Sequence, residues 1–195
     1  MTASSDNELC RSLNIRQQHT VAWQRTISPG YAIAIRPVCL HNNDDLEMIG
    51  KWVEQGYGVC QQPDQLRIIY TIIAECTYMQ SIIIMLNHEF PVCVADIGDV
   101  TWDEVIEYYD ACPGDFRLQL PVLPVFPGFP NLVPDVIETC LDYFFSYPGV
   151  RRIVWTIYAD ETSGIETAQK TGFQLLDTLS EKGRPMRVYI VSREN

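Results

Sequence analysis

The stretch LDYFFSYPGVRRIVWTIYADETSGIETAQKTGF, from Leu141 to Phe173, decides the fold of this chain. It reads as the end of a helix, a turn, an almost wholly apolar strand over Arg152 to Tyr158, and a second helix over Ser163 to Thr171. Phe173 opens a further strand. An apolar strand between two helices is typical of the centre of a sheet that is covered on both faces.

The rest of the chain supplies the other elements of one domain. Residues 1–18 are polar and are expected to form a loose arm, which leaves residues 19–195 as a single domain. A chain of 195 residues buries roughly 70% of its unfolded surface in one core. The runs HTVAWQ and YAIAIRPV, separated by the turn signal SPG, predict an opening hairpin.

Helical spacing follows the hairpin, and the period then changes to that of strands. Leu46, Ile49 and Val53 predict a helix that ends at Gly56, and Leu66, Ile69 and Ile73 predict the apolar face of a second helix from Pro63 to about Cys76. The remaining predictions are an antiparallel pair from YMQSIIIML and FPVCVADIG, a short acidic helix over Thr101 to Asp110, a prolonged strand RLQLPVLPV, a helix over Pro134 to Ser146, and a final pair from FQLLDTLS and PMRVYIVS.

Charge and cysteine content exclude several classes of function. The chain has 25 acidic and 14 basic residues, and the net charge of -11 disfavours nucleic acid and anionic membranes as partners. Its seven cysteines form no CxxC pair, which favours free thiols in a reducing compartment. No run approaches the ~18 apolar residues of a membrane-spanning helix, and the N-terminus lacks the pattern of a signal peptide. We therefore expect a cytoplasmic protein without a metal site, since its three histidines lie far apart.

The order of these elements resembles the GNAT superfamily of acyl-CoA N-acyltransferases. The most specific marker is QKTGF at Gln169 to Phe173, which is similar to the K-x-G-F that closes the second cofactor-contacting helix of that superfamily. Over residues 31–192, the resemblance implies an α/β (α+β) fold with a mixed, mostly antiparallel central sheet, flanking helices and a splayed central strand pair.

Within the superfamily the chain is most similar to the siderophore-type lysine N-acyltransferases. The shared motifs, in order, are RPV at Arg36 to Val38, D-D-L at Asp44 to Leu46, P-G-D at Pro113 to Asp115, and an L-D-Y-F-F-like helix end running into P-x-V-R-R at Leu141 to Arg152. The resemblance implies direct attack of a small amine or hydroxylamine on the thioester of acetyl-CoA or another acyl-CoA. Backbone amides around Leu120 to Val122 would polarise the thioester carbonyl.

The resemblance also implies where the cofactor and the substrate would lie. The expected cofactor-binding residues are Leu120, Val122, Phe126, Gly128, Phe129, Asn131, Leu132 and Lys170. The expected substrate-binding residues are Trp52, Tyr78, Asp96 and Tyr109. For the aromatic side chains, burial in the core is the more common alternative.

Several positions depart from the pattern of the superfamily. Phe129, Asn131 and Val133 stand where small residues are expected in the pyrophosphate-binding turn, and Gly128 is one place off. The prolines at 121, 124, 127, 130 and 134 lack amide hydrogens, so this stretch cannot form a continuous nest of donors. It is either a reshaped acyl channel or, as we favour, a rigid loop that fills the groove.

The catalytic positions depart as well. Ala168 replaces a tyrosine that often protonates the leaving thiolate, and Glu161 replaces an asparagine. Gln119 and Thr156 stand where the siderophore branch has His and Asp. Gln119 or Glu161 would therefore have to handle the amine proton, although a helix cap is the more common role for a carboxylate such as Glu161.

Two further features leave alternatives open. Asp115 of the P-G-D motif is expected to serve a turn or a cap rather than catalysis. The acidic run from Asp96 to Asp110 could attract a cationic amine, but a solvated face is the more common explanation. The rival to an active acyltransferase is a GNAT-like protein that has lost its catalytic activity and binds a ligand or protein through the old cofactor groove.

Overall fold

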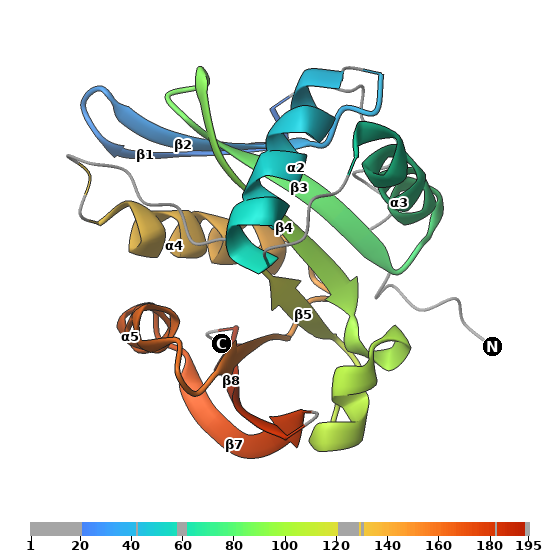
Figure 1. Cartoon of the computed structure of the whole chain (residues 1–195). Coiled ribbons are helices and arrows are strands. Elements are labelled where there is room, and N and C mark those ends of the chain that lie inside the picture. The colour runs from blue at the N-terminus through green and yellow to red at the C-terminus, as the bar shows by residue number, and fades with distance from the viewer. Residues whose placement is uncertain are drawn as a thin grey trace.

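The computed structural model describes residues 21–41, 43–57, 62–120, 129, 131–181 and 183–193. Within these residues eight strands form one sheet in the order β1-β2-β3-β4-β5-β6-β8-β7 (Figure 1). Every neighbouring pair is antiparallel except β5 and β6, which are parallel. The strands are β1 (Trp23–Ser28), β2 (Tyr31–Pro37), β3 (Met79–Leu86), β4 (Phe90–Asp99), β5 (Asp115–Gln119), β6 (Arg152–Tyr158), β7 (Gln174–Glu181) and β8 (Arg184–Ser192). The predicted mixed, mostly antiparallel sheet is confirmed.

Helices cover both faces of this sheet. The described helices are α2 (Asn43–Tyr57), α3 (Pro63–Glu75), α4 (Leu132–Phe145) and α5 (Thr162–Lys170). One buried cluster joins the sheet to α4 and α5, and a second joins the opposite face to α2 and α3 (Figure 1). None of the helices in the described part of the chain has the length and apolarity needed to cross a membrane.

Strand β3 is buried on both of its faces. Ile82 and Ile84 belong to the cluster under α4, whereas Ile83 and Met85 belong to the cluster under α2 and α3. Successive side chains of a strand point to opposite faces, so a central strand with helices on both sides must be apolar throughout. The continuous apolar run of β3 is explained in this way.

The acidic segment after β4 is not the short α-helix that the sequence predicts. It forms two 3-10 turns, η2 (Val100–Trp102) and η3 (Glu104–Tyr108). The side chain of Asp99 accepts a hydrogen bond from the amide of Thr101, and the side chain of Asp103 accepts one from the amide of Val105. Such local bonds compete with helical hydrogen bonds, so the segment divides at Asp103.

The boundaries of most other elements are close to the predictions, with three differences. The opening strand is predicted over HTVAWQ, at residues 19–24, whereas β1 runs from Trp23 to Ser28 and so extends into the predicted turn signal SPG. The buried face of α3 is formed by Leu66, Tyr70 and Ile73, whereas Ile69 is 40% exposed. Positions i, i+4 and i+7 share one side of a helix, and Ile69 lies beside that stripe. The predicted prolonged strand from Arg117 ends at Gln119 in the described part, and residues 121–128 lie outside the description.

Gly114, which precedes β5, allows a close backbone contact. Its φ is +90°, and a Cβ there would lie 2.7 Å from the carbonyl oxygen of Gly149 and 2.9 Å from Cγ of Arg151. Its own oxygen accepts the amides of Arg151 and Arg152 at 2.8 and 3.2 Å. The P-G-D motif therefore fixes the start of β5 against the start of β6.

We predict that Gly114→Ala destabilises the protein more than Gly30→Ala. Gly30 also has a positive φ of +75°, but a Cβ there meets nothing within 4 Å. Gly30→Ala should carry only a left-handed backbone strain of about 1–2 kcal/mol, whereas Gly114→Ala adds a backbone clash of about 1–3 kcal/mol. Urea unfolding of both variants measures the difference, and equal losses would contradict the close contact.

Candidate active site

The candidate site lies where the parallel strands β5 and β6 separate. Their pairing begins at Asp115 and Arg152 and ends at Leu118 and Trp155. Strand β6 continues beyond that point, paired with β8 as far as Tyr158. The ladder between the two central strands therefore stops while β6 still has three residues to run.

A buried ion pair holds the beginning of the two strands together. The carboxylate of Asp115 accepts hydrogen bonds from Nε and Nη2 of Arg152, at 2.6 and 2.5 Å. The same carboxylate accepts the hydroxyl of Tyr109 and the amide of Cys112, both at 2.9 Å. Burial, together with the neighbouring Asp115, raises the pKa of Tyr109, and the hydrogen bond that Arg152 donates to Asp115 raises the pKa of Arg152. Asp115 thus makes a structural connection, in line with the turn-and-cap interpretation of P-G-D.

At the open end of the pair, Gln119 and Asp96 lie side by side. Gln119 is the last residue of β5, and its partner in β4 is Asp96, whose own partner in β3 is Ser81. The hydroxyl of Ser81 donates to the carboxylate of Asp96 at 2.5 Å. Burial raises the pKa of Asp96 to about 6, and the hydrogen bond from Ser81 opposes part of that rise. Asp96 is therefore a carboxylate that can exchange a proton near neutral pH.

Arg117 bridges β5 and β6 on the same face. Its Nη1 donates to Asp103 at 2.6 Å, and its Nη2 donates to the hydroxyl of Thr156 at 3.0 Å. Its Nε is buried with no partner in the described part of the protein. The hydroxyl of Thr156 thus already accepts a hydrogen bond from this arginine.

The first turn of α4 offers few amide donors. The amide of Leu132 donates to Phe129 at 3.1 Å, that of Asp135 donates to Asn131 at 3.0 Å, and Pro134 has no amide hydrogen. For the amides of Asn131 and Val133, no partner is found among the described residues of this turn. A ligand at this helix end would meet few amides rather than a continuous nest.

Several predicted cofactor residues surround this turn. The ring of Phe129 packs against Tyr31, with centroids 5.3 Å apart, and Leu132 is buried in the core. Asn131 is exposed immediately before α4. The predicted residues Val122, Phe126 and Gly128 lie outside the described residues.

The two predicted residues around α5 lie at opposite ends of that helix. Glu161 precedes α5, and its carboxylate lies 3.7 Å from Nη2 of Arg184. Burial raises the pKa of Glu161, and Arg184 counteracts the rise. Its side chain makes no capping hydrogen bond, and Lys170 is exposed in the last turn of α5. The helix therefore separates these two positions by about 13 Å along its axis.

The predicted substrate residues also divide into separate groups. Trp52 packs against the cluster under α2 and α3, and Tyr109 is bonded to Asp115. Tyr78 stacks on the exposed Trp102 with centroids 5.1 Å apart. Of all the predicted side chains, the structure places Asp96, Gln119 and Leu120 beside the strand separation. Their roles, like those of the other predicted residues, stay predictions.

Sequence reasoning did not identify Ser81 and Arg117 as parts of this site. Arg117 carries a detectable signal, since it is a charged residue between the apolar Phe116 and Leu118, whereas Ser81 follows the polar Gln80 and is less distinct. Residues 115, 117 and 119 alternate with Phe116 and Leu118, so the pattern places Arg117 on the face of Gln119. Their partners across the sheet needed the tertiary structure.

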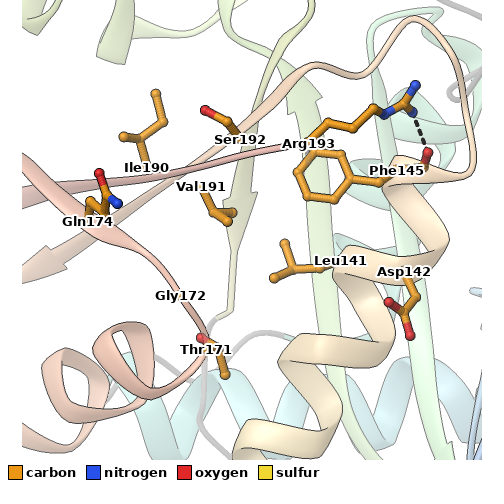
Figure 2. A pocket seen from close by; sticks show the side chains of 10 residues that line it. All are labelled: Leu141, Asp142, Phe145, Thr171, Gly172, Gln174, Ile190, Val191, Ser192 and Arg193. Carbon is orange, nitrogen blue, oxygen red and sulfur yellow. Dashed lines mark hydrogen bonds between the residues drawn. The ribbon is translucent and has the colours of Figure 1, made fainter. Parts of the chain in front are cut away.

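A separate pocket of about 700 Å³ lies at the end of β8, which pairs with the beginning of β6 (Figure 2). It is formed by the last turns of α4, the residues after α5 and the end of β8. Leu141, Phe145 and Val191 give it an apolar wall, and Arg193 donates to the carbonyl oxygens of Phe145 and Tyr147. Helices α4 and α5 both begin at the open end of β5 and β6, so this pocket lies away from the candidate active site.

The comparison with protein families identifies the class of this domain. Residues 41–180 match the family described as an acetyltransferase (GNAT) domain. The chain therefore belongs to the GNAT family of acetyltransferases, and it is an enzyme of the acyltransferase class. No match was found among curated proteins.

Solved structures share this fold at low sequence identity. A protein of uncharacterised function from Bacillus halodurans is 15% identical, with a TM-score of 0.72, over 83% of this chain and 84% of that chain. The aminoglycoside acetyltransferase AAC(6')-Ib in complex with coenzyme A is 17% identical, with a TM-score of 0.69, over 83% and 95%. A spermidine N-acetyltransferase from Vibrio cholerae with CoA and spermine is 12% identical, with a TM-score of 0.65, over 82% and 95%.

We predict that Asp115→Asn destabilises the fold strongly. The change leaves Arg152 beside an uncharged amide in a site where the side chain of Asp115 is fully buried, which should cost about 3 kcal/mol in the free energy of unfolding. Asp160→Asn is the matched control, because Asp160 makes a similar pair with Arg184 on the exposed surface. Denaturant titration should show a large loss for the first variant and almost none for the control. Similar losses would contradict the role of the buried pair.

Proposed function

We propose that this protein is an N-acyltransferase that transfers an acyl group from acyl-CoA to a small, cationic amine. The observation that carries the proposal is the end of the β5–β6 ladder at Leu118 and Trp155, beside Asp96 and Gln119. An extended pantetheine arm can add to a free strand edge by main-chain hydrogen bonds. Membership of the GNAT family agrees with this use of the edge.

The residues of the site fit the acyl donor at two places. The main chain of Gln119 and Leu120 lies where the ladder towards β6 has ended, so it is available to the pantetheine arm. The amide of Val133, in the first turn of α4, is one donor for a phosphate, since no partner for it is found among the described residues. When bound, acyl-CoA supplies the activated thioester. The protein would contribute the position of the amine relative to that group.

The charge of the chain supports a cationic acceptor. The net charge is -11, and Asp96 lies beside the strand separation. Two of the proteins with a similar fold are named as an aminoglycoside acetyltransferase and a spermidine N-acetyltransferase. We therefore propose an acceptor with at least one primary amine or hydroxylamine and an overall positive charge.

The siderophore-type resemblance supports a shared scaffold more than a shared acceptor. Arg36 of the RPV motif makes a bidentate ion pair with Asp45 of the D-D-L motif, with N–O distances of 2.7 and 2.8 Å. Asp115 of P-G-D pairs with Arg152 of the P-x-V-R-R motif. These motif residues connect elements of the fold, so N6-hydroxylysine is one candidate acceptor among several.

The alternative of a GNAT-like protein without activity is not favoured. Such a protein should have closed the space between β5 and β6, whereas their pairing ends at Leu118. The ring of Phe129, which would have blocked the cofactor, packs against Tyr31. We also propose a cytoplasmic location, because Cys93, Cys112 and Cys140 are thiols and two of them, Cys93 and Cys140, are buried.

The direct test is binding followed by turnover. Calorimetry with acetyl-CoA should show saturable binding, and free-thiol release should then be measured with spermine, kanamycin and N6-hydroxylysine as acceptors. We expect release that depends on both the enzyme and the acceptor. Absence of heat and of any thermal shift at millimolar acetyl-CoA would remove this function.

We predict that Val133→Pro weakens CoA binding about tenfold, because it removes one amide donor to a charged group. Proline is tolerated in the first turn of a helix, so the fold should be retained. Val133→Ala is the matched control, since it shortens the side chain but keeps the amide hydrogen. Calorimetric dissociation constants for CoA measure the effect. Equal affinities of the two variants would exclude this amide as a phosphate ligand.

A further inference from the structure

Asp96 occupies a defined place at the strand separation. It pairs with Gln119, the last residue of β5, and adjacent strands lie about 4.8 Å apart. Paired residues of neighbouring strands project to the same face of a sheet. Ala95 and Ile97 belong to the cluster under α4, so Asp96 and Gln119 project to the face that carries α2 and α3.

The two polar neighbours of this point on β5 and β6 cannot take a proton. Gln119 has no group that titrates near neutral pH. Thr156 has no such group either, and its hydroxyl already accepts Arg117. Glu161 lies at the start of α5 with half of its side chain exposed, near Arg184.

We propose that Asp96, oriented by Ser81, is the catalytic base that binds the ammonium group of the acceptor and removes its proton. This inference rests on the proposed N-acyltransferase function. Asp96 was expected from the sequence only to attract the substrate, and the base was expected to be Gln119 or Glu161. The geometry moves that role to the neighbouring strand.

The surroundings of Asp96 suit a base. It keeps some access to solvent, and Ser81 donates to one carboxylate oxygen, while the other has no partner among the residues that the structure describes. Arg117 is the cation of β5 on this face, and its charge is matched by Asp103 at 2.6 Å. On α2, which packs over β4, Lys51 and Glu54 are exposed. Burial is therefore the main influence on the carboxylate, and it raises its pKa to about 6.

The proton transfer balances with the acyl transfer. The ammonium group gives one proton to Asp96, which passes it to solvent. The freed lone pair of the nitrogen forms a bond to the thioester carbonyl carbon, and the carbon–sulfur bond breaks. The sulfur keeps that electron pair and receives the second proton that the nitrogen loses, so the products are an amide and a thiol.

The test compares Asp96→Asn with Asp99→Asn. Both variants remove one negative charge from β4, but Asp99 lies on the opposite face and accepts the amide of Thr101. Acetyl transfer from acetyl-CoA is measured with the best acceptor among spermine, kanamycin and N6-hydroxylysine. We expect Asp96→Asn to lower kcat/KM by about 100-fold or more without changing the calorimetric affinity for CoA, and Asp99→Asn to stay within about twofold of the wild type.

Two pH-dependent readouts separate a base from a merely structural residue. The wild-type kcat/KM should fall below about pH 6, as Asp96 becomes protonated, and Asp96→Asn should lack this fall.

The second readout is the pH dependence of stability. The carboxyl of Asp96 is protonated in the folded and unfolded states below its ordinary pKa of 3.8, and it is ionised in both well above pH 6. Its raised pKa therefore lowers folding stability as pH rises through that window. Asp96→Asn should unfold at a higher temperature than the wild type at pH 7.5, with the difference vanishing at low pH.

The outcomes distinguish the inference from the function on which it rests. A wild type that transfers acetyl groups, with Asp96→Asn within about threefold of it, would overturn the role of Asp96 and leave the proposed function intact. Loss of activity in Asp96→Asn together with lower thermal stability at pH 7.5 would also overturn the role, because it would mark a structural residue. A wild type that transfers to none of the acceptors would remove both proposals.

Discussion

The buried pair between Asp115 and Arg152 is the constraint on which the rest of the structure depends. It joins the first residues of the two parallel strands, and Asp115 also holds Tyr109 and Cys112 of the preceding segment. An unpaired charge at such a site is expensive, so the two strands cannot slide past each other. At the same end, Gly114 makes a close backbone contact that any residue with a Cβ atom would prevent. With their beginnings fixed, β5 and β6 can separate only at their carboxyl ends.

That separation arranges polar and apolar groups on different faces. Phe116 and Leu118 anchor β5 to the core under α4, while Arg117 and Gln119 project to the other face. Asp96 joins them from β4 because its register places it opposite Gln119. One face of the sheet at the site is therefore apolar. The other face carries the carboxylate of Asp96, the amide of Gln119 and the ion-paired Arg117. In the proposed reaction, the amine would approach from that polar face.

The motifs that support the family resemblance act mainly in folding. The RPV and D-D-L motifs meet in the pair Arg36–Asp45, and P-G-D and P-x-V-R-R meet in the pair Asp115–Arg152. The acidic run does not form one solvated face either, because Asp96, Asp99 and Asp103 have separate partners in Ser81, Thr101 and Arg117. The motifs that stand out in the sequence thus contain residues that stabilise the fold. The residues proposed for the reaction, Asp96 and Gln119, lie at positions that stand out less.

The sequence by itself determined the order of the elements, the buried central strands and the covered sheet, because periodicity fixes local conformation and the face of each side chain. It did not determine the 3-10 turns after β4, where side-chain bonds to amides outweigh helix propensity, or the stripe of α3 that faces the sheet. Only the tertiary structure decided that Asp96 and Gln119 are neighbours and that the β5–β6 ladder ends at Leu118. Cross-strand neighbours depend on strand order and register, which are set by the packing of the whole domain and by the Asp115–Arg152 pair rather than by local sequence.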